Sequence, residues 1–224
     1  MLQFGPVNLG YTSAVISSYL LGSIPTGYVV GLAKGVDIRK VGSGNIGATN
    51  VFRSLGQRLG IFVLVADGLK GWAACELISN LVLRNFYAES INDLPFAEYL
   101  KMTCGVCVIL GHNYTFWLRF KGGKGIATTA GVLAALFWPV FITVLSTWIV
   151  FFLATRYVSI GSIAAAISLP IAAIIFNNSH RLIFVASILG ALALWKHLPN
   201  FKRLLQGTEN RISFRKKPDP EVAK

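Results

Sequence analysis

Long apolar stretches recur along this chain, and they constrain its fold more than any other feature. Tyr11–Ala33 and Ile61–Leu83 are each apolar over about the 20 residues that a helix needs to cross a bilayer. Only 13% of the 224 residues are charged, whereas a soluble protein carries about 25% charged residues. Because backbone polar groups inside lipid must be satisfied internally, we predict an all-α integral membrane protein.

Four more apolar stretches follow along the chain. They cover Tyr99–Gly111, Ile126–Ala154, Val158–Phe176 and Leu182–Trp195. The crossings near 99–111 and 126–137 are shorter than a full span, so we expect some short helices and a cavity that opens toward the cytoplasm. Ile126–Ala154 is interrupted by Trp138-Pro139 and can form either one crossing or two.

The distribution of charge decides between these two counts. Lysine and arginine gather at 34–58, at 112–125 and in the tail 196–224, whereas 84–98 is acidic. The positive-inside rule places basic loops in the cytoplasm, which requires two crossings within 126–154. We therefore predict seven transmembrane helices, with the N-terminus outside and the C-terminus cytoplasmic. We also predict a single polytopic membrane domain over residues 1–224, with no cleaved signal peptide.

The three cysteines are not predicted to form a metal or redox site. Cys104-x-x-Cys107 has a suitable spacing, but no second pair accompanies it and it lies within an apolar run. Packing of small residues between helices explains it better. We expect no metal and no other cofactor.

A glycine-rich turn, Phe120–Gly125, is the strongest indication of a binding site. Three of its residues are glycines and two are lysines, and an apolar helix start follows. Exposed N–H groups at a helix N-terminus and nearby lysines suit a phosphate. The alternative is a basic turn that only fixes topology. The residues predicted to bind the anion are His112, Asn113, Lys121, Gly122, Gly123, Lys124, Gly125 and Thr128.

A second glycine-rich stretch, Gly42–Arg53, ends in an arginine that suits bidentate binding of phosphate. It lacks the Lys-Ser/Thr of a Walker A loop. Taken alone, it also fits a capped helix start, with Thr49 or Asn50 as the cap. The residues predicted to serve the substrate here are Ser43, Gly44, Asn45, Thr49, Asn50 and Arg53.

Two polar features lie within the first two spans. Pro25 predicts a kink in the first span, which serves either helix packing or a backbone opening. Asp67 and Lys70 share a helix face in the second span, roughly 10–15 Å from its basic end. Buried charges must pair or face water, so we keep both a structural ion pair and a substrate contact as interpretations.

A third polar motif, Trp195–Asn200 followed by Arg203–Asn210, completes a set of three on the predicted cytoplasmic face. Together the motifs resemble the bacterial acyl-phosphate:glycerol-3-phosphate acyltransferases, the PlsY family, over essentially the whole chain. The matching patterns are Gly-Ser-Gly-Asn-x-Gly-x-Thr-Asn-x-x-Arg at 42–53, Gly-His followed by Phe-Lys-Gly-Gly-Lys at 111–124, and His-x-x-Asn-x-x-Arg with Gly-x-Glu at 197–209. The family often has proline where this chain has Thr115 or Phe116.

The resemblance implies transfer of an acyl group from acyl phosphate to the 1-position of sn-glycerol 3-phosphate, which gives lysophosphatidic acid and phosphate. It assigns the acyl phosphate to Gly122 and Gly123. It implies that four residues are catalytic, namely Ser43, Arg53, His197 and Asn200. In the third motif it also implies a substrate contact for Arg203 and structural support from Glu209. We expect a monomer in the bacterial inner membrane, with a cytoplasmic active site, membrane lipid as a partner and no nucleic acid.

Elementary chemistry agrees with this reaction. Two phosphate anions in one site need several fixed positive groups. Because an acyl phosphate is already activated, positioning and charge stabilisation suffice without an acyl-enzyme. Three candidates for the base remain, namely His197, His112 and the substrate's own phosphate, and we favour an orienting role for His197. A transporter of a phosphorylated metabolite is the competing class, although it would place polar groups at the bilayer midplane.

Overall fold

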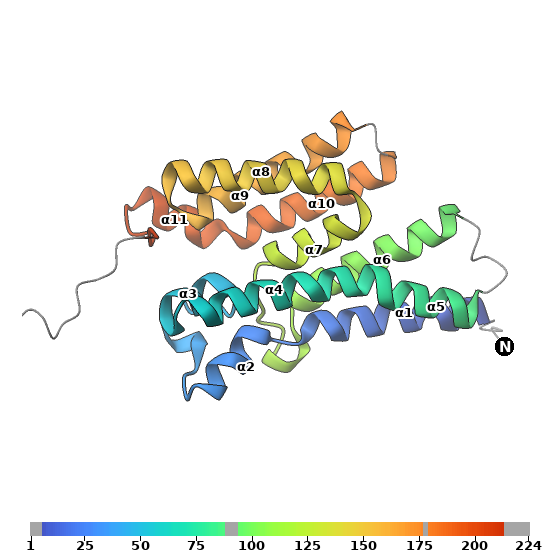
Figure 1. Ribbon diagram of the computed structural model, residues 1–224, viewed down its shortest axis with the longest axis horizontal. Coiled ribbons are helices and arrows are strands. Elements are labelled where there is room, and N and C mark those ends of the chain that lie inside the picture. Colours follow the sequence, from blue (N-terminus) through green and yellow to red (C-terminus); the bar gives the residue numbers. More distant parts are fainter. Residues whose placement is uncertain (1–5, 88–93, 177–178, 213–224) are drawn as a thin grey trace, which may run out of the picture. The chain divides into compact units, whose positions relative to one another are not determined.

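The computed structural model describes residues 6–87, 94–176 and 179–212, and every regular element in these ranges is a helix (Figure 1). This confirms the all-α class. The chain divides into two compact units, Met1–Phe141 and Ile142–Lys224. Within the described ranges three segments are long and apolar enough to cross a membrane, and a bent helix pair adds a fourth. The count of seven crossings stays a prediction.

The first span is broken where Pro25 predicted a kink. Helix α1 covers Pro6–Ser23 and α2 covers Thr26–Ala33. Proline has no N–H and disfavours helical geometry in the residue before it, so the helical ladder stops at Ile24. The break leaves backbone carbonyls in the interior of the first unit, where polar side chains reach them.

Helix α6, Leu94–Asn113, packs along α1. Glycines permit the close approach, since a Cβ on Gly22 would overlap the carbonyl of Val108. With 20 residues, α6 corrects the prediction of a short crossing at 99–111. The helix continues through polar residues, and Lys101 pairs with Glu76 at 3.0 Å with both side chains about a quarter exposed.

The second span is an uninterrupted helical run. It consists of α4 (Gln57–Ala73), a π-helical turn η2 (Ala74–Ile78) and α5 (Ser79–Phe86), so it exceeds the predicted 61–83 at both ends. Cys75 and Cys104 are buried at the contact of η2 with α6, as expected for packing residues.

Helix α7, Ile126–Leu136, has 11 residues, which confirms the predicted short helix. It packs against α4 with backbone contact, because a Cβ on Gly71 would overlap the carbonyl of Thr128. Phe137 separates α7 from α8 (Trp138–Thr155), so the predicted turn at Trp138-Pro139 is confirmed as a helix boundary.

The basic segment 34–58 is folded rather than an open loop. It contains the 3-10 turn η1 (Ile38–Lys40) and helix α3 (Ala48–Leu55), which packs on α4. Its apolar side chains form a buried cluster with α4 and with the 3-10 turn η4 (Phe116–Leu118). The members of that cluster are Ile38, Ile46, Val51, Val63 and Leu118.

In the second unit, α9 (Val158–Ile175) packs against α10 (His180–Lys196). The Trp148 indole of α8 donates to the Ser162 hydroxyl of α9 at 3.2 Å. Helix α11, Leu198–Leu205, follows α10 at a bend of 49°. The basic tail predicted from residue 196 is therefore helical over Leu198–Leu205, and buried polar contacts at Glu209 hold the chain just beyond that helix.

Candidate functional site

The Lys121–Gly125 segment is fastened to the C-terminal end of α6. The amide of Gly123 donates to the His112 carbonyl at 3.0 Å, and the amide of Gly122 donates to the Asn113 carbonyl at 3.2 Å. A Cβ on Gly122 would overlap the His112 carbonyl oxygen, and one on Gly123 would overlap the His112 ring. Glycine is required here for close packing. The prediction that these two amides face a phosphate is corrected, since both have carbonyl partners.

The N-terminus of α7 lies directly after this segment. Gly125 precedes the helix with a left-handed φ of +78°, and no side chain caps the first turn. Thr128, in that turn, is fully buried and its hydroxyl oxygen has no hydrogen-bond partner among the described residues. Lys121 is exposed and Lys124 half-buried. The start of α7 is thus a helix N-terminus without a side-chain cap, a few residues beyond the Gly-Gly pair.

Asn50 organises the loop that leads into α3. Its side-chain NH2 group donates to the carbonyls of Ile38, Val41 and Asn45 at 2.9–3.0 Å. Its Oδ1 accepts from the amide of Ser43 at 2.9 Å. These bonds give Asn50 a role in loop geometry, and its predicted contact with the substrate stays a prediction.

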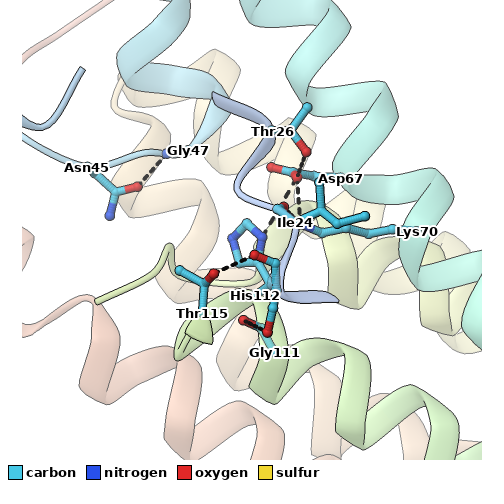
Figure 2. Close-up of polar contacts among 10 residues, drawn as sticks. Ile24, Thr26, Asn45, Gly47, Asp67, Lys70, Gly111, His112 and Thr115 are labelled. Carbon is cyan, nitrogen blue, oxygen red and sulfur yellow. Dashed lines mark hydrogen bonds and ion pairs between the residues drawn. The ribbon is translucent and has the colours of Figure 1, made fainter. Parts of the chain in front are cut away.

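The same loop corrects two further predictions. Helix α3 has Gly47 as its N-cap with no side-chain cap bond, so neither Thr49 nor Asn50 is the cap. The side-chain oxygen of Asn45 accepts from the Gly47 amide at 2.7 Å, which engages Asn45 within the loop (Figure 2). Ser43 and Gly44 are exposed, whereas Thr49 and Arg53 are half-buried.

Asp67 and Lys70 form a buried ion pair in the middle of the first unit (Figure 2). Lys70 Nζ lies 2.8 Å from Asp67 Oδ1 and donates to the Ile24 carbonyl at 3.2 Å. The two side chains are only 6% and 4% exposed. The structure therefore supports the ion-pair interpretation, and a direct substrate contact of either residue stays a prediction.

Three hydroxyl hydrogen bonds that the sequence did not predict connect the break between α1 and α2 to α4 and to the end of α6. Thr26 Oγ1 donates to Asp67 Oδ1 at 3.0 Å, Thr115 donates to the Ser23 carbonyl, and Ser23 donates to the Gly111 carbonyl at 3.4 Å (Figure 2). The signal available in the sequence was the broken span itself, since carbonyls freed at a proline break need donors.

The third motif forms a polar cluster in the second unit. Glu209 is buried and accepts from Asn200 at 2.8 Å and from Arg203 Nε at 2.7 Å. Burial raises the pKa of the Glu209 carboxyl, but these two hydrogen bonds together with the positive charge of Arg203 lower it, and its pKa is below the ordinary value. Glu209 thus has the geometry of a structural support, and the predicted substrate contact of Arg203 stays a prediction.

His197 lies between α10 and α11. Its Nδ1 is 2.8 Å from the Ala193 carbonyl, which fixes the proton on Nδ1 and makes Nε2 the acceptor of the neutral ring. The ring is 4% exposed. A ring held in one orientation and one tautomer matches the orienting role favoured for His197.

A model of the glycerol-3-phosphate acyltransferase family matches residues 12–207, which includes the first two motifs and the third as far as Gly207. The chain belongs to this family. The match runs from α1 to the second residue after α11 and so includes residues of both compact units.

Relatives within the glycerol-3-phosphate acyltransferase family match over most of their length. The chain is 43% identical over 196 residues to the glycerol-3-phosphate acyltransferase of Geotalea daltonii, covering 88% of this chain and 94% of that protein. It is 41% identical over 212 residues to that of Desulforamulus reducens, covering 94% and 99%.

Two crystal structures of PlsY, an integral membrane glycerol 3-phosphate acyltransferase, also match this family member. The glycerol 3-phosphate form is 38% identical with a TM-score of 0.78, and the match covers 91% of this chain and 96% of that one. The lysophosphatidic acid form is 36% identical with a TM-score of 0.77, covering 91% and 95%. The fold is therefore that of an integral membrane protein.

Proposed function

We propose that this glycerol-3-phosphate acyltransferase takes its acyl group from an acyl phosphate. The 1-hydroxyl oxygen of glycerol 3-phosphate attacks the acyl carbon, the bond from that carbon to the phosphate oxygen breaks, and the hydroxyl proton leaves with the phosphate. The products are lysophosphatidic acid and phosphate. The PlsY structures in glycerol 3-phosphate and lysophosphatidic acid forms support this acceptor and this product.

The observation that carries the proposal is the start of α7. Its first turn has no side-chain cap, and Lys121 and Lys124 precede it. The positive end of a helix dipole and two lysines stabilise a phosphate, and they stabilise it more as negative charge develops on the departing phosphate. A thiolate leaving group would not be stabilised in this way, because it carries no phosphate at the reacting carbon for these groups to bind.

We assign the phosphate of the acceptor to the stretch Gly42–Arg53, which is the loop before α3 and most of that helix, and we call it the α3 loop. Exposed Ser43 and half-buried Arg53 lie at its two ends, and an arginine can hold two phosphate oxygens at once. In the second unit, His197 orients a substrate group through Nε2. Three groups are candidates for the base that takes the hydroxyl proton before it reaches the phosphate: His197, His112 and the substrate phosphate. With any of them, the activated donor needs no covalent enzyme intermediate.

The donor is tested with purified protein and three acyl donors compared side by side. We expect turnover with palmitoyl phosphate, and none above background with palmitoyl-CoA or a palmitoyl acyl-carrier-protein thioester. The Arg53→Ala variant, purified identically, sets the background from contaminating enzymes. Equal turnover with palmitoyl-CoA and palmitoyl phosphate, absent in the variant, would overturn the proposed donor.

We also propose seven crossings in the bacterial inner membrane, with the N-terminus outside, the catalytic groups on the cytoplasmic side, and residues 1–224 acting as one monomeric domain. Basic residues at 34–58 and 196–212 support this orientation. Single cysteines at exposed Asn85 and exposed Gln206, in a cysteine-free background, test it. An impermeant maleimide should label Asn85→Cys on intact cells and Gln206→Cys only after lysis, and the reverse pattern would refute the topology.

A further inference from the structure

The Asp67 carboxylate gathers groups from three parts of the first unit onto one oxygen. Its Oδ1 accepts from Thr26 at the start of α2, pairs with Lys70 on α4, and lies 3.7 Å from His112 Nδ1 at the end of α6 (Figure 2). The last contact is longer than a hydrogen bond. A simple ion pair would need only Lys70, so the approach of His112 calls for a separate explanation.

The opposite edge of the His112 ring meets the Lys121–Gly125 segment. A Cβ on Gly123 would overlap His112 Nε2 and would lie 2.9 Å from Cε1. The Gly123 amide also donates to the carbonyl of the same histidine. His112 therefore contacts the segment with both its ring and its backbone, and Asp67 faces the Nδ1 edge of the ring, on the other side from Gly123.

Burial makes the carboxylate effective at this distance. Asp67 and His112 are 3% and 6% exposed, so water screens their interaction little. Lys70 balances the charge that a buried carboxylate would otherwise leave unpaired. Asp67 can thus attract the Nδ1 edge of the His112 ring while its own ion pair with Lys70 remains neutral.

We propose that Asp67 is a positioning residue that acts through His112: it fixes the orientation of the imidazole, which in turn holds the Lys121–Gly125 segment and sets the start of α7. The inference rests on the proposed function, because it takes the start of α7 as the site of the donor phosphate. Loss of Asp67 should therefore weaken the use of acyl phosphate more than the use of glycerol 3-phosphate.

The test separates positioning from charge balance by replacing both members of the ion pair. Asp67→Asn combined with Lys70→Met removes the pair without leaving a buried charge, so the melting temperature Tm should stay near that of the native protein. We expect the KM for palmitoyl phosphate to rise about tenfold, the size of one charge-assisted interaction, with little change in the KM for glycerol 3-phosphate.

A further substitution tests the route through the histidine. Adding His112→Gln to the double variant should give the same KM for palmitoyl phosphate as His112→Gln alone, since Asp67 acts only through that ring. Thr26→Val is the matched control, because it removes another partner of the same carboxylate oxygen and should leave both KM values unchanged. Native KM values in the double variant, equal losses for both substrates, or additive losses with His112→Gln would overturn the proposal.

A second measurement does not depend on the donor. Hydrogen exchange of residues 120–125, followed by mass spectrometry, reports on the Gly122 and Gly123 amides that bond to α6. We expect faster exchange in the double variant and native exchange in Thr26→Val. Unchanged exchange in the double variant would refute the positioning role even if palmitoyl phosphate proved not to be the donor, whereas inactivity of the native protein toward it would refute only the proposed function.

Discussion

Replacing Gly122 by alanine should lower kcat/KM for palmitoyl phosphate by on the order of a hundredfold or more. The new Cβ would overlap the His112 carbonyl oxygen, so the segment must move away from α6. That movement strains two backbone hydrogen bonds, from Gly122 and Gly123, and costs about 1 kcal/mol for each bond in addition to the overpacking. The KM for the acyl phosphate should rise more than the KM for glycerol 3-phosphate, since the displaced segment leads into α7.

Gly68→Ala provides the matched control for this substitution. A Cβ on Gly68 would lie 3.6 Å from the Ala127 carbonyl, which is ordinary van der Waals contact. Alanine also has about 1 kcal/mol better helix propensity than glycine. Gly68→Ala should therefore keep native kinetics, with a Tm equal to or above that of the native protein. Near-native kcat/KM in Gly122→Ala, or equal losses in the two variants, would show that close packing at Gly122 does not matter to the donor site.

Arg53→Lys should lose roughly tenfold to a hundredfold in kcat/KM although the charge is kept. Arginine presents a planar fork that can hold two phosphate oxygens, whereas lysine acts as a point charge. The effect should fall mainly on glycerol 3-phosphate if the α3 loop binds the acceptor. Steady-state kinetics with each substrate varied in turn measure it.

Arg58→Lys is the control for a general effect of arginine in this basic region. Arg58 is exposed near the start of α4, five residues beyond Arg53, and no motif includes it. It should behave like the native protein. If Arg53→Lys also kept native kcat/KM, the guanidinium would contribute only its positive charge, and the proposed bidentate binding of phosphate would be wrong.

The tertiary structure changes how the glycine-rich turn is understood. The sequence pattern predicted amides open to an anion at Gly122 and Gly123, and the structure gives both amides carbonyl partners on α6. The helix start after Gly125 keeps the property that the pattern indicated, an N-terminus without a side-chain cap. We therefore propose the anion site a few residues along the chain, at the start of α7, and the glycines have a packing role.

Features that depend on neighbours in sequence could be predicted from the sequence by itself. They include the helical class, the break at Pro25, the boundary at Trp138-Pro139, and the pairing of Asp67 with Lys70 at i and i+3. Proline geometry, apolar length and helical spacing are local properties, so they are encoded directly in the order of residues. The three motifs also indicated the family that the comparisons establish.

Features that depend on which segments meet were decided only by tertiary packing. Asn50 was predicted to serve the substrate, but carbonyls from three separate points of the loop occupy its amide. His112 faces both Asp67, 45 residues earlier, and Gly123, because α4, α6 and the glycine segment converge in the first unit. A residue type states which hydrogen bonds a side chain can make, and the packing of distant segments selects the partner that receives them.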